Sequence, residues 1–136
     1  MKQFLIAILI LFSFEANAQL DFLQGTWQGL KVNMGQANNK GQAIWFDFNI
    51  DKASKKLTGD ARVEIPFTDY YALKIINGKV ISKNEIEFED AMFGNKKNSV
   101  RSYWCLLKGK LIYNEETGYL TGTFTSPDCR SEIGKI

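Results

Sequence analysis

Three glutamates at alternate positions are the first residues in this chain whose type and spacing could do chemistry. Glu85, Glu87 and Glu89 alternate with Ile86 and Phe88, so all three would lie on one face of a strand. Paired carboxylates can serve as the acid and the base of glycoside hydrolysis. Glutamates on the polar side of an amphipathic strand are nevertheless more typical of a solvated surface, and we favour that interpretation.

The groups that most other catalytic sites need are missing from the sequence. There is no histidine among the 136 residues, which excludes Ser-His-Asp and Cys-His arrangements. The two cysteines, Cys105 and Cys129, are expected to be oxidised, so neither would supply a thiolate nucleophile. We therefore expect a protein that is not an enzyme and that uses no cofactor.

One acidic stretch imitates the start of a calcium-binding loop. Asp47, Asn49 and Asp51 have the initial spacing of that loop. Its sixth position would be Lys52, where glycine is needed, and its twelfth would be Thr58, where glutamate is needed. The outer face of a strand explains the spacing instead. Two thiolates without histidine also lack the usual four zinc ligands, so no metal site is predicted.

Aromatic side chains are the remaining candidates for a binding site, since they can stack on sugars or line an apolar pocket. Trp45 shares one side of a strand with Asp47 and Asn49, and an outward tryptophan beside polar groups is a candidate contact. Cover by the loop 33–42 would explain it equally well. The candidate ligand-binding residues are Trp45, Asp47, Asn49, Tyr71 and Trp104. Trp27 is assigned to the core, and Trp104 could also be a core anchor.

Alternation of apolar and polar residues predicts the elements that hold these side chains. No long helical period is present, so the fold is expected to be all-β. About eight strands are predicted in sequence order, near residues 26–33, 43–51, 57–65, 70–81, 85–92, 99–113, 118–126 and 131–136. An antiparallel up-and-down meander of this kind closes into a barrel or folds into a flattened sandwich. We favour the small barrel, because closure removes exposed edges.

The last long hairpin has a predicted register. A four-residue loop at 114–117 would place Tyr113 opposite Gly118. The inward pairs would then be Leu111 with Leu120, Gly109 with Gly122, and Leu107 with Phe124, whereas a slip of one residue would break this match. The same register sets Cys105 opposite Ser126, and the Pro127-Asp128 turn then carries Cys129 back beside Cys105.

A second hairpin has two possible strand arrangements. Asn77-Gly78 is a strong two-residue turn signal, which would end a strand at Ile76. A loop at 82–84 would instead leave one long strand from about residue 70 to 81. The long strand pairs Gly78 with Phe88, Val80 with Ile86 and Ile76 with Asp90. We prefer it because phenylalanine over glycine is a favourable cross-strand arrangement.

The N-terminus has the pattern of a secretory signal peptide. A short basic start, an apolar run at 4–14 and small residues at 16–18 predict cleavage before Gln19. The run is too short to span a membrane, and no cysteine follows it to anchor a lipoprotein. We predict a signal peptide at 1–18 and one soluble domain at 19–136, located in the periplasm, at the cell surface or outside the cell.

Export makes the cysteine count informative. An even number of cysteines in an oxidising compartment favours a disulfide, here Cys105–Cys129. Closing a loop of this length would stabilise the fold by roughly 3 kcal/mol. The formal net charge is only +2 and the lysines are dispersed over turn-like segments, so no nucleic-acid partner is expected.

The start of the first predicted strand resembles that of a known protein family. Gly25-Thr26-Trp27, early in the first strand of an exported eight-strand meander, resembles the G-x-W start of lipocalin-like (calycin) barrels, and avidin-like barrels begin similarly. The chain also looks like small exported bacterial modules with a GTW-G start and a WC…C ending. The resemblance implies that Trp27 packs across the closed end of the barrel, with Arg130 as the late-strand arginine. The biotin site of avidins does not carry over.

Two functions are compatible with this reading. The first is an exported, non-enzymatic, lipocalin-like barrel that binds a small apolar molecule, a glycan or a protein partner. The second is a structural or adhesion module of the bacterial cell envelope, with a solid core and no ligand pocket. They differ in whether a lined cavity is present.

Overall fold

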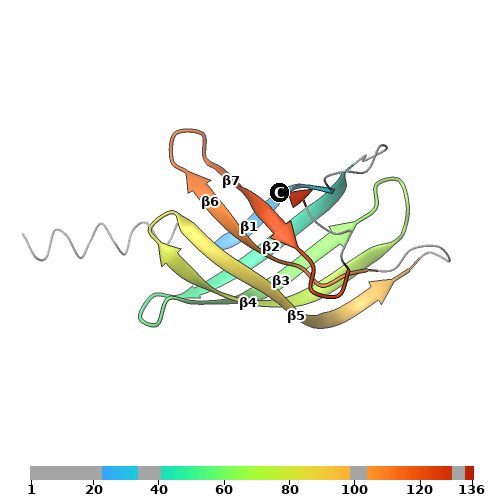
Figure 1. The fold of residues 1–136 in the computed structure, drawn as a ribbon, viewed down its shortest axis with the longest axis horizontal. Coiled ribbons are helices and arrows are strands. Elements are labelled where there is room, and N and C mark those ends of the chain that lie inside the picture. Colours follow the sequence, from blue (N-terminus) through green and yellow to red (C-terminus); the bar gives the residue numbers. More distant parts are fainter. Residues whose placement is uncertain (1–22, 34–40, 99–103, 130–133) are drawn as a thin grey trace, which may run out of the picture.

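The chain forms a closed, eight-stranded antiparallel β-barrel (Figure 1). The computed structural model describes residues 23–33, 41–98, 104–129 and 134–136. Each strand pairs with the next along the chain, and β8 pairs with both β7 and β1. The strands are β1 (Gly25–Asn33), β2 (Gln42–Asp51), β3 (Lys56–Glu64), β4 (Tyr71–Ser82), β5 (Glu85–Lys97), β6 (Lys108–Asn114), β7 (Tyr119–Thr125) and β8 (Gly134–Lys135). The predicted all-β meander is confirmed.

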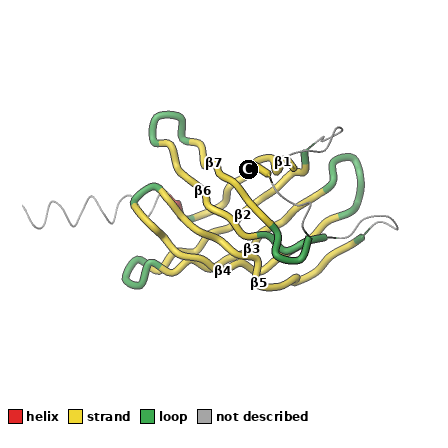
Figure 2. The backbone as a smooth tube through the Cα atoms, in the orientation of Figure 1, coloured by secondary structure: helices red, strands yellow, loops and turns green. Residues whose placement is uncertain are grey.

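The boundaries of five predicted strands agree with the structure to within one residue, and Figure 2 shows the strands and the loops that join them. The eighth strand, predicted at 131–136, is Gly134–Lys135, and its predicted start lies outside the described residues. Two other strands differ more. The fifth strand continues to Lys97 instead of ending near residue 92, and the sixth begins only at Lys108. The predicted signal peptide, Arg130 and most of the loop 33–42 lie outside the described residues.

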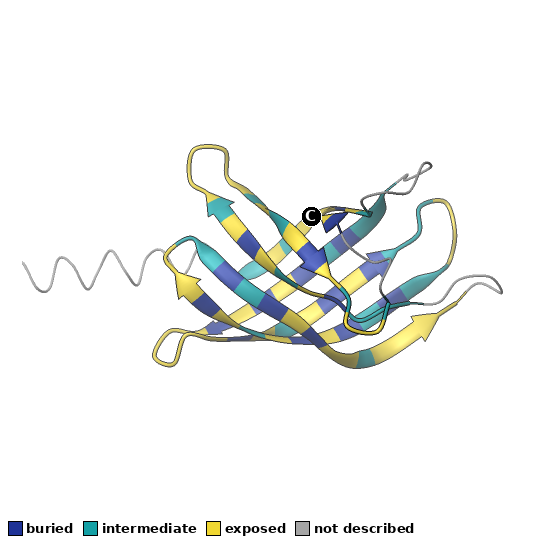
Figure 3. Cartoon of the chain, viewed as in Figure 1, coloured by how far each residue is buried: buried dark blue, intermediate teal, exposed yellow. Residues whose placement is uncertain are grey.

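Side-chain direction follows the predicted alternation. On β2, Ile44, Phe46, Phe48 and Ile50 are buried, whereas the residues between them face outward. The bands of buried and exposed residues along each strand are visible in Figure 3. Because successive side chains in a strand point to opposite faces, each strand contributes every second residue to a single core.

A row of alternating glycine and phenylalanine crosses the barrel interior. Gly78, Phe88, Gly109, Phe124 and Gly134 lie directly opposite one another on β4 to β8. A Cβ atom on any of the three glycines would collide with a main-chain carbonyl oxygen of a neighbouring strand. The glycines therefore let the strands approach and bend, and the phenylalanine rings fill the space above them.

The β4–β5 hairpin has the predicted register. Gly78 lies opposite Phe88, and the long strand continues through the Asn77-Gly78 pair without turning. Irregularities between Leu73 and Lys74 and between Ile75 and Ile76 then add residues to β5. These bulges allow β5 to follow β4 as far as Lys97, which simple alternation could not foresee.

The predicted register of the β6–β7 hairpin is wrong by two residues. Tyr113, Leu111 and Gly109 lie opposite Leu120, Gly122 and Phe124. An even shift leaves the same side chains pointing inward, so the predicted inner face is correct although its pairs are not.

Loop hydrogen bonds explain this shift. Gly118 adopts a φ of 72° and donates its N–H to the Asn114 carbonyl at 2.8 Å. The Asn114 side-chain oxygen accepts the N–H groups of Glu116 and Thr117. Gly118 therefore belongs to the loop, since its left-handed conformation suits a turn, and the first pair beyond it is Asn114 with Tyr119.

Candidate functional site

The candidate residues on β2 lie on the outer face of the barrel, as predicted. Trp45 is half-buried, and Asp47 and Asn49 are exposed. Trp45 lies opposite Gln28 on β1 and Arg62 on β3. None of the three lines either of the two pockets described below.

Tyr71 belongs to the same outer face, two strands away. The guanidinium carbon of Arg62 lies 5.1 Å from the centre of its ring, and Asn95 donates its side-chain N–H to the tyrosine oxygen at 3.1 Å. Arg62 therefore lies on the outer face of β3, between the strands that carry Trp45 and Tyr71. In the sequence, Arg62 stands between the inward residues Ala61 and Val63. This alternation could have identified Arg62 as a further candidate for the binding site.

Trp104 lies at the end of the barrel where β5 finishes. Its indole N–H donates to the Lys97 carbonyl at 3.0 Å, and its ring packs against the core. Lys97 lies opposite Tyr71, so Trp104 and Tyr71 occur at the same end of the barrel. Packing against the core is the arrangement expected if Trp104 is a core anchor.

Trp27 lies near the start of β1. Its ring packs against the core and meets Tyr113 edge-on, with the ring centres 5.8 Å apart. Its indole N–H donates to the Leu23 carbonyl at 3.0 Å, and Leu23 itself is fully buried. These contacts hold the Trp27 ring against the core.

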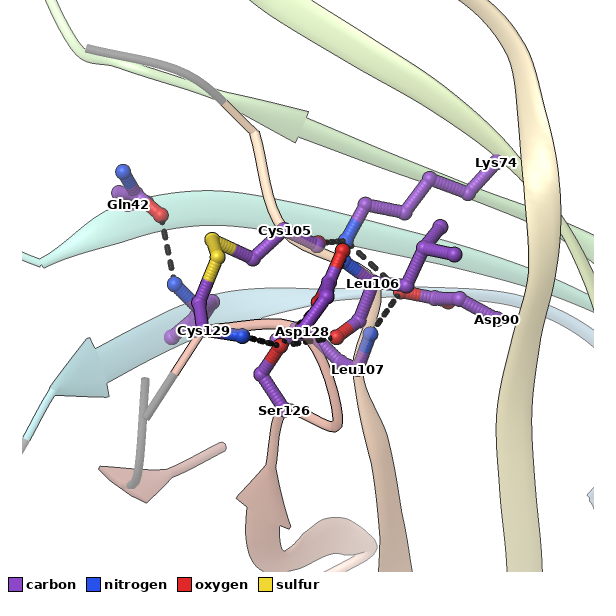
Figure 4. The surroundings of a disulfide bond; sticks show 10 residues. Gln42, Lys74, Asp90, Cys105, Leu106, Leu107, Ser126, Asp128 and Cys129 are labelled. Carbon is purple, nitrogen blue, oxygen red and sulfur yellow. Dashed lines mark hydrogen bonds and ion pairs between the residues drawn. A yellow bond between two sulfur atoms is a disulfide. The ribbon is translucent and has the colours of Figure 1, made fainter. Parts of the chain in front are cut away.

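A buried ion pair between Lys74 and Asp90 lies beside the segment that carries Cys105 (Figure 4). The Lys74 Nζ atom lies 2.7 Å from an Asp90 carboxylate oxygen, and both side chains are 2% exposed. The same Asp90 oxygen accepts the N–H of Leu107, and Lys74 also donates to the Cys105 carbonyl, each at 2.7 Å. Burial raises the pKa of Asp90, and the attraction of Lys74 opposes this rise.

These contacts explain why residues 104–107 do not extend β6. The Leu107 N–H and the Cys105 carbonyl are bound by inward side chains, and the Leu106 N–H donates to the Asp128 carboxylate at 3.2 Å. Backbone groups occupied in this way are not available to a sheet ladder. The sequence carried a signal for the pair, because Lys74 stands at an inward position between Ala72 and Ile76.

The predicted disulfide between Cys105 and Cys129 is present, with a Cα–Cα distance of 5.9 Å. Asp128 lies beside it and accepts hydrogen bonds from the Leu106 N–H and the Ser126 hydroxyl. Partial burial acts to raise the pKa of Asp128, but these hydrogen bonds outweigh it and the pKa is lowered. Although Asp128 and the two sulfurs lie close together, sulfurs joined in a disulfide are not thiolate metal ligands.

An apolar pocket of about 320 Å³ opens through the barrel wall between β1 and β7. We call it the seam pocket. Core side chains form its inner wall, and Leu30 and Tyr119, which are 59% and 69% exposed, lie at its rim. The residues that line it include Trp27, Gly29, Ile44, Phe46, Leu111, Leu120 and Ile136. Sequence reasoning missed this pocket.

A second hollow of about 720 Å³ lies on the outer face across β4 to β7. It contains Glu87 and Glu89, two of the three alternating glutamates of β5. Lys110 lies 3.7 Å from Glu85 and 3.5 Å from Glu87, and Lys79 lies 3.5 Å from Glu87. The glutamates therefore form part of a mixed, charged outer surface.

Comparisons with protein-family models, with curated proteins and with solved structures each found no match for this chain. Within the described ranges, no helix is long and apolar enough to cross a membrane.

Proposed function

We propose that this protein is an exported, non-enzymatic binding module, lipocalin-like in shape, that accepts an apolar group in the seam pocket. The observation that carries this proposal is a concave site whose inner wall is formed by core side chains, Phe46 and Leu111 among them. Its volume is near the lower end of the range for ligand sites. The position of Trp27 at the start of β1 and at a closed barrel end supports the likeness to calycins.

The packing of side chains in the barrel interior supports binding through the barrel wall. Phenylalanine rings pack the middle, with Phe46 and Phe48 stacked at 5.1 Å and Phe46 edge-on to Phe88 at 5.3 Å. The Lys74–Asp90 ion pair lies across one end. An apolar group that enters sideways at β1 and β7 would meet the core without displacing either feature.

The disulfide supports export, because such bonds persist in oxidising compartments. A periplasmic, cell-surface or extracellular location follows from the N-terminal pattern. The mass of the mature protein tests this part, since cleavage should leave Gln19 as its first residue.

Fluorescence titration with an apolar probe, 1-anilinonaphthalene-8-sulfonate, tests the pocket. In a variant with Trp45→Phe and Trp104→Phe, Trp27 is the only indole, and it lines the pocket. We expect a saturable change in Trp27 emission. Gly29→Val should weaken probe binding at least tenfold, because a Cβ atom at Gly29 meets nothing within 4 Å and the new side chain would fill the pocket.

Thr26→Val is the matched control, because Thr26 is exposed on the same strand and does not line the pocket. Its affinity for the probe should equal that of the parent. No change in Trp27 emission would contradict the proposal and favour the second candidate, a structural or adhesion module with a solid core. The charged hollow across β4 to β7 is the observation that favours this candidate.

A further inference from the structure

The hollow across β4 to β7 lies over the row of glycine and phenylalanine. Its floor is formed by Gly78, Phe88, Gly109 and Phe124, which pair in that order across the four strands. The two rings are buried on the inner side and glycine has no side chain, so mainly backbone faces the hollow. Four strands span roughly 14 Å. The hollow is thus long across the strands, and its volume of about 720 Å³ is in the range of ligand sites.

Two rows of outward polar side chains flank this floor. The first, which we call the paired row, consists of Lys79, Glu87, Lys110 and Thr123, again one from each strand. The Glu87 carboxylate lies 3.5 Å from the ammonium groups of both Lys79 and Lys110. These ion pairs hold the three charged side chains of this row against one another.

The second row, which we call the open row, consists of Asn77, Glu89, Lys108 and Thr125. All four residues are exposed. Within the described part of the chain, none of their side chains has a hydrogen bond or an ion pair with another residue. The open row therefore presents an amide, a carboxylate, an ammonium and a hydroxyl group, at successive strand spacings, to whatever enters the hollow.

The composition and pairing of the hollow do not suit a protein partner. Lysine and glutamate are depleted from the centres of protein interfaces, whereas three lysines and two glutamates are among the residues that line this hollow. A peptide that adds as a strand needs a free strand edge. At the floor, β4 and β7 are paired on their far sides as well, at Gly78 with β3 and at Phe124 with β8.

The mixture of charges selects a neutral ligand. An anionic polymer would be repelled by Glu87 and Glu89, and a cationic one by the lysines of both rows. A hydroxyl group can donate a hydrogen bond to a carboxylate and can also accept one from an ammonium group. A neutral chain with many hydroxyl groups therefore matches all four members of the open row without meeting a like charge.

We propose that the hollow binds a neutral oligosaccharide with an extended, β-1,4-linked chain that lies across β4 to β7. Its C–H groups contact the backbone of the floor, and its hydroxyl groups bond to the open row. The chain is extended because the four groups of that row follow one line across the strands. Strand faces of another small barrel, the OB-fold, also bind oligosaccharides. This site is separate from the seam pocket, since no residue lines both.

NMR titration of the ¹⁵N-labelled protein with cellotetraose, a β-1,4-linked glucose tetramer, tests the proposal. We expect saturable shifts that are largest at the amides of Lys108 and Gly109. Maltotetraose, which has the same sugar units in a curved α-1,4-linked chain, should bind more weakly. Glu89→Ala should weaken binding of cellotetraose about tenfold, because it removes a charged hydrogen-bond acceptor. Glu85→Ala is the matched control, since Glu85 lies on the same face of β5 but does not line the hollow.

Four results would overturn the proposal. The first is the absence of saturable shifts with cellotetraose, or equal binding by the Glu89→Ala and Glu85→Ala variants. The second is tighter binding of a charged tetramer, either of galacturonate or of glucosamine. The third is a set of shifts centred on Gly29 and Leu120, which would place the sugar in the seam pocket. The fourth is shifts in the hollow on raising the protein concentration without sugar, which would show that a second copy covers it. The apolar-probe titration tests the seam pocket independently of all four.

Discussion

At the scale of single residues, the buried ion pair between Lys74 and Asp90 has the largest expected effect on stability. Two charges that are each 2% exposed lose nearly all of their hydration. Their attraction and the hydrogen bonds to Leu107 and Cys105 offset this loss. Because those bonds reach the backbone before β6, the pair also holds this segment and the adjoining disulfide at the barrel end.

Lys74→Met should therefore lower the free energy of unfolding near neutral pH by about 3–5 kcal/mol, since it leaves a buried carboxylate without its partner. Burial raises the pKa of Asp90, and without Lys74 nothing of similar strength opposes this rise. A raised pKa means that the folded state binds the proton more tightly. The deficit should thus be small below the usual aspartate value of 3.8 and grow as pH rises through the folded-state value.

Urea denaturation at several pH values measures this dependence. Lys79→Met is the matched control, because Lys79 forms an ion pair with Glu87 but its side chain is 65% exposed. An exposed pair contributes less than about 1 kcal/mol. Equal losses in the two variants would show that burial of the Lys74–Asp90 pair is not what makes it important.

At the scale of elements, the alternation of glycine and phenylalanine across β4 to β8 determines how the strands bend. Gly109 lies between Phe88 and Phe124 on the two neighbouring strands. A Cβ atom there would collide with the Thr123 carbonyl oxygen and would also meet the Phe88 ring at 3.0 Å. The position therefore requires glycine for close approach of the strands.

Gly109→Ala should destabilise the barrel by about 1–3 kcal/mol, the usual range for an overpacked core. Gly29→Ala is the control on another strand, since its added Cβ would meet nothing within 4 Å. That change should alter stability by no more than about 1 kcal/mol, because only backbone entropy is affected. Thermal unfolding of the two variants compares them directly, and a Gly109→Ala variant as stable as Gly29→Ala would contradict the packing argument.

At the scale of the whole molecule, β8 closes the barrel. β8 has two residues, yet it is the only described strand that joins β7 to β1. The disulfide is attached nearby, because Cys129 follows β7 and Cys105 precedes β6. Closure of the barrel and constraint of the chain by the disulfide are thus concentrated in the last third of the sequence.

Replacing both cysteines by serine should lower the free energy of unfolding by roughly 3 kcal/mol, because the closed loop spans a sequence separation of 24. Wild-type protein unfolded by urea in the presence of dithiothreitol should lose a similar amount. The double variant should not respond to dithiothreitol, which provides the control. A wild-type protein unaffected by reduction would show that the disulfide does not contribute to stability.

Local pattern was sufficient for much of this fold and for part of the candidate site. It predicted the inward residues of β2, the outward position of Trp45, Asp47 and Asn49, and the Gly78–Phe88 pair. These features depend on a period of two along one strand or on neighbours across a short loop. Short-range sterics and burial decide them, so they can be read from residues close together in sequence.

Alternation left other features undecided. A period of two does not distinguish registers that differ by two residues, and hydrogen bonds within the loop, between Asn114 and Gly118, select the β6–β7 pairing. Tertiary structure decided the rest. The ion pair of Lys74 joins β4, β5 and the segment at Cys105. The seam pocket is lined by residues of β1 and β7, which are far apart in the sequence. The ion pair and the pocket arise when the barrel closes, and no local pattern encodes them.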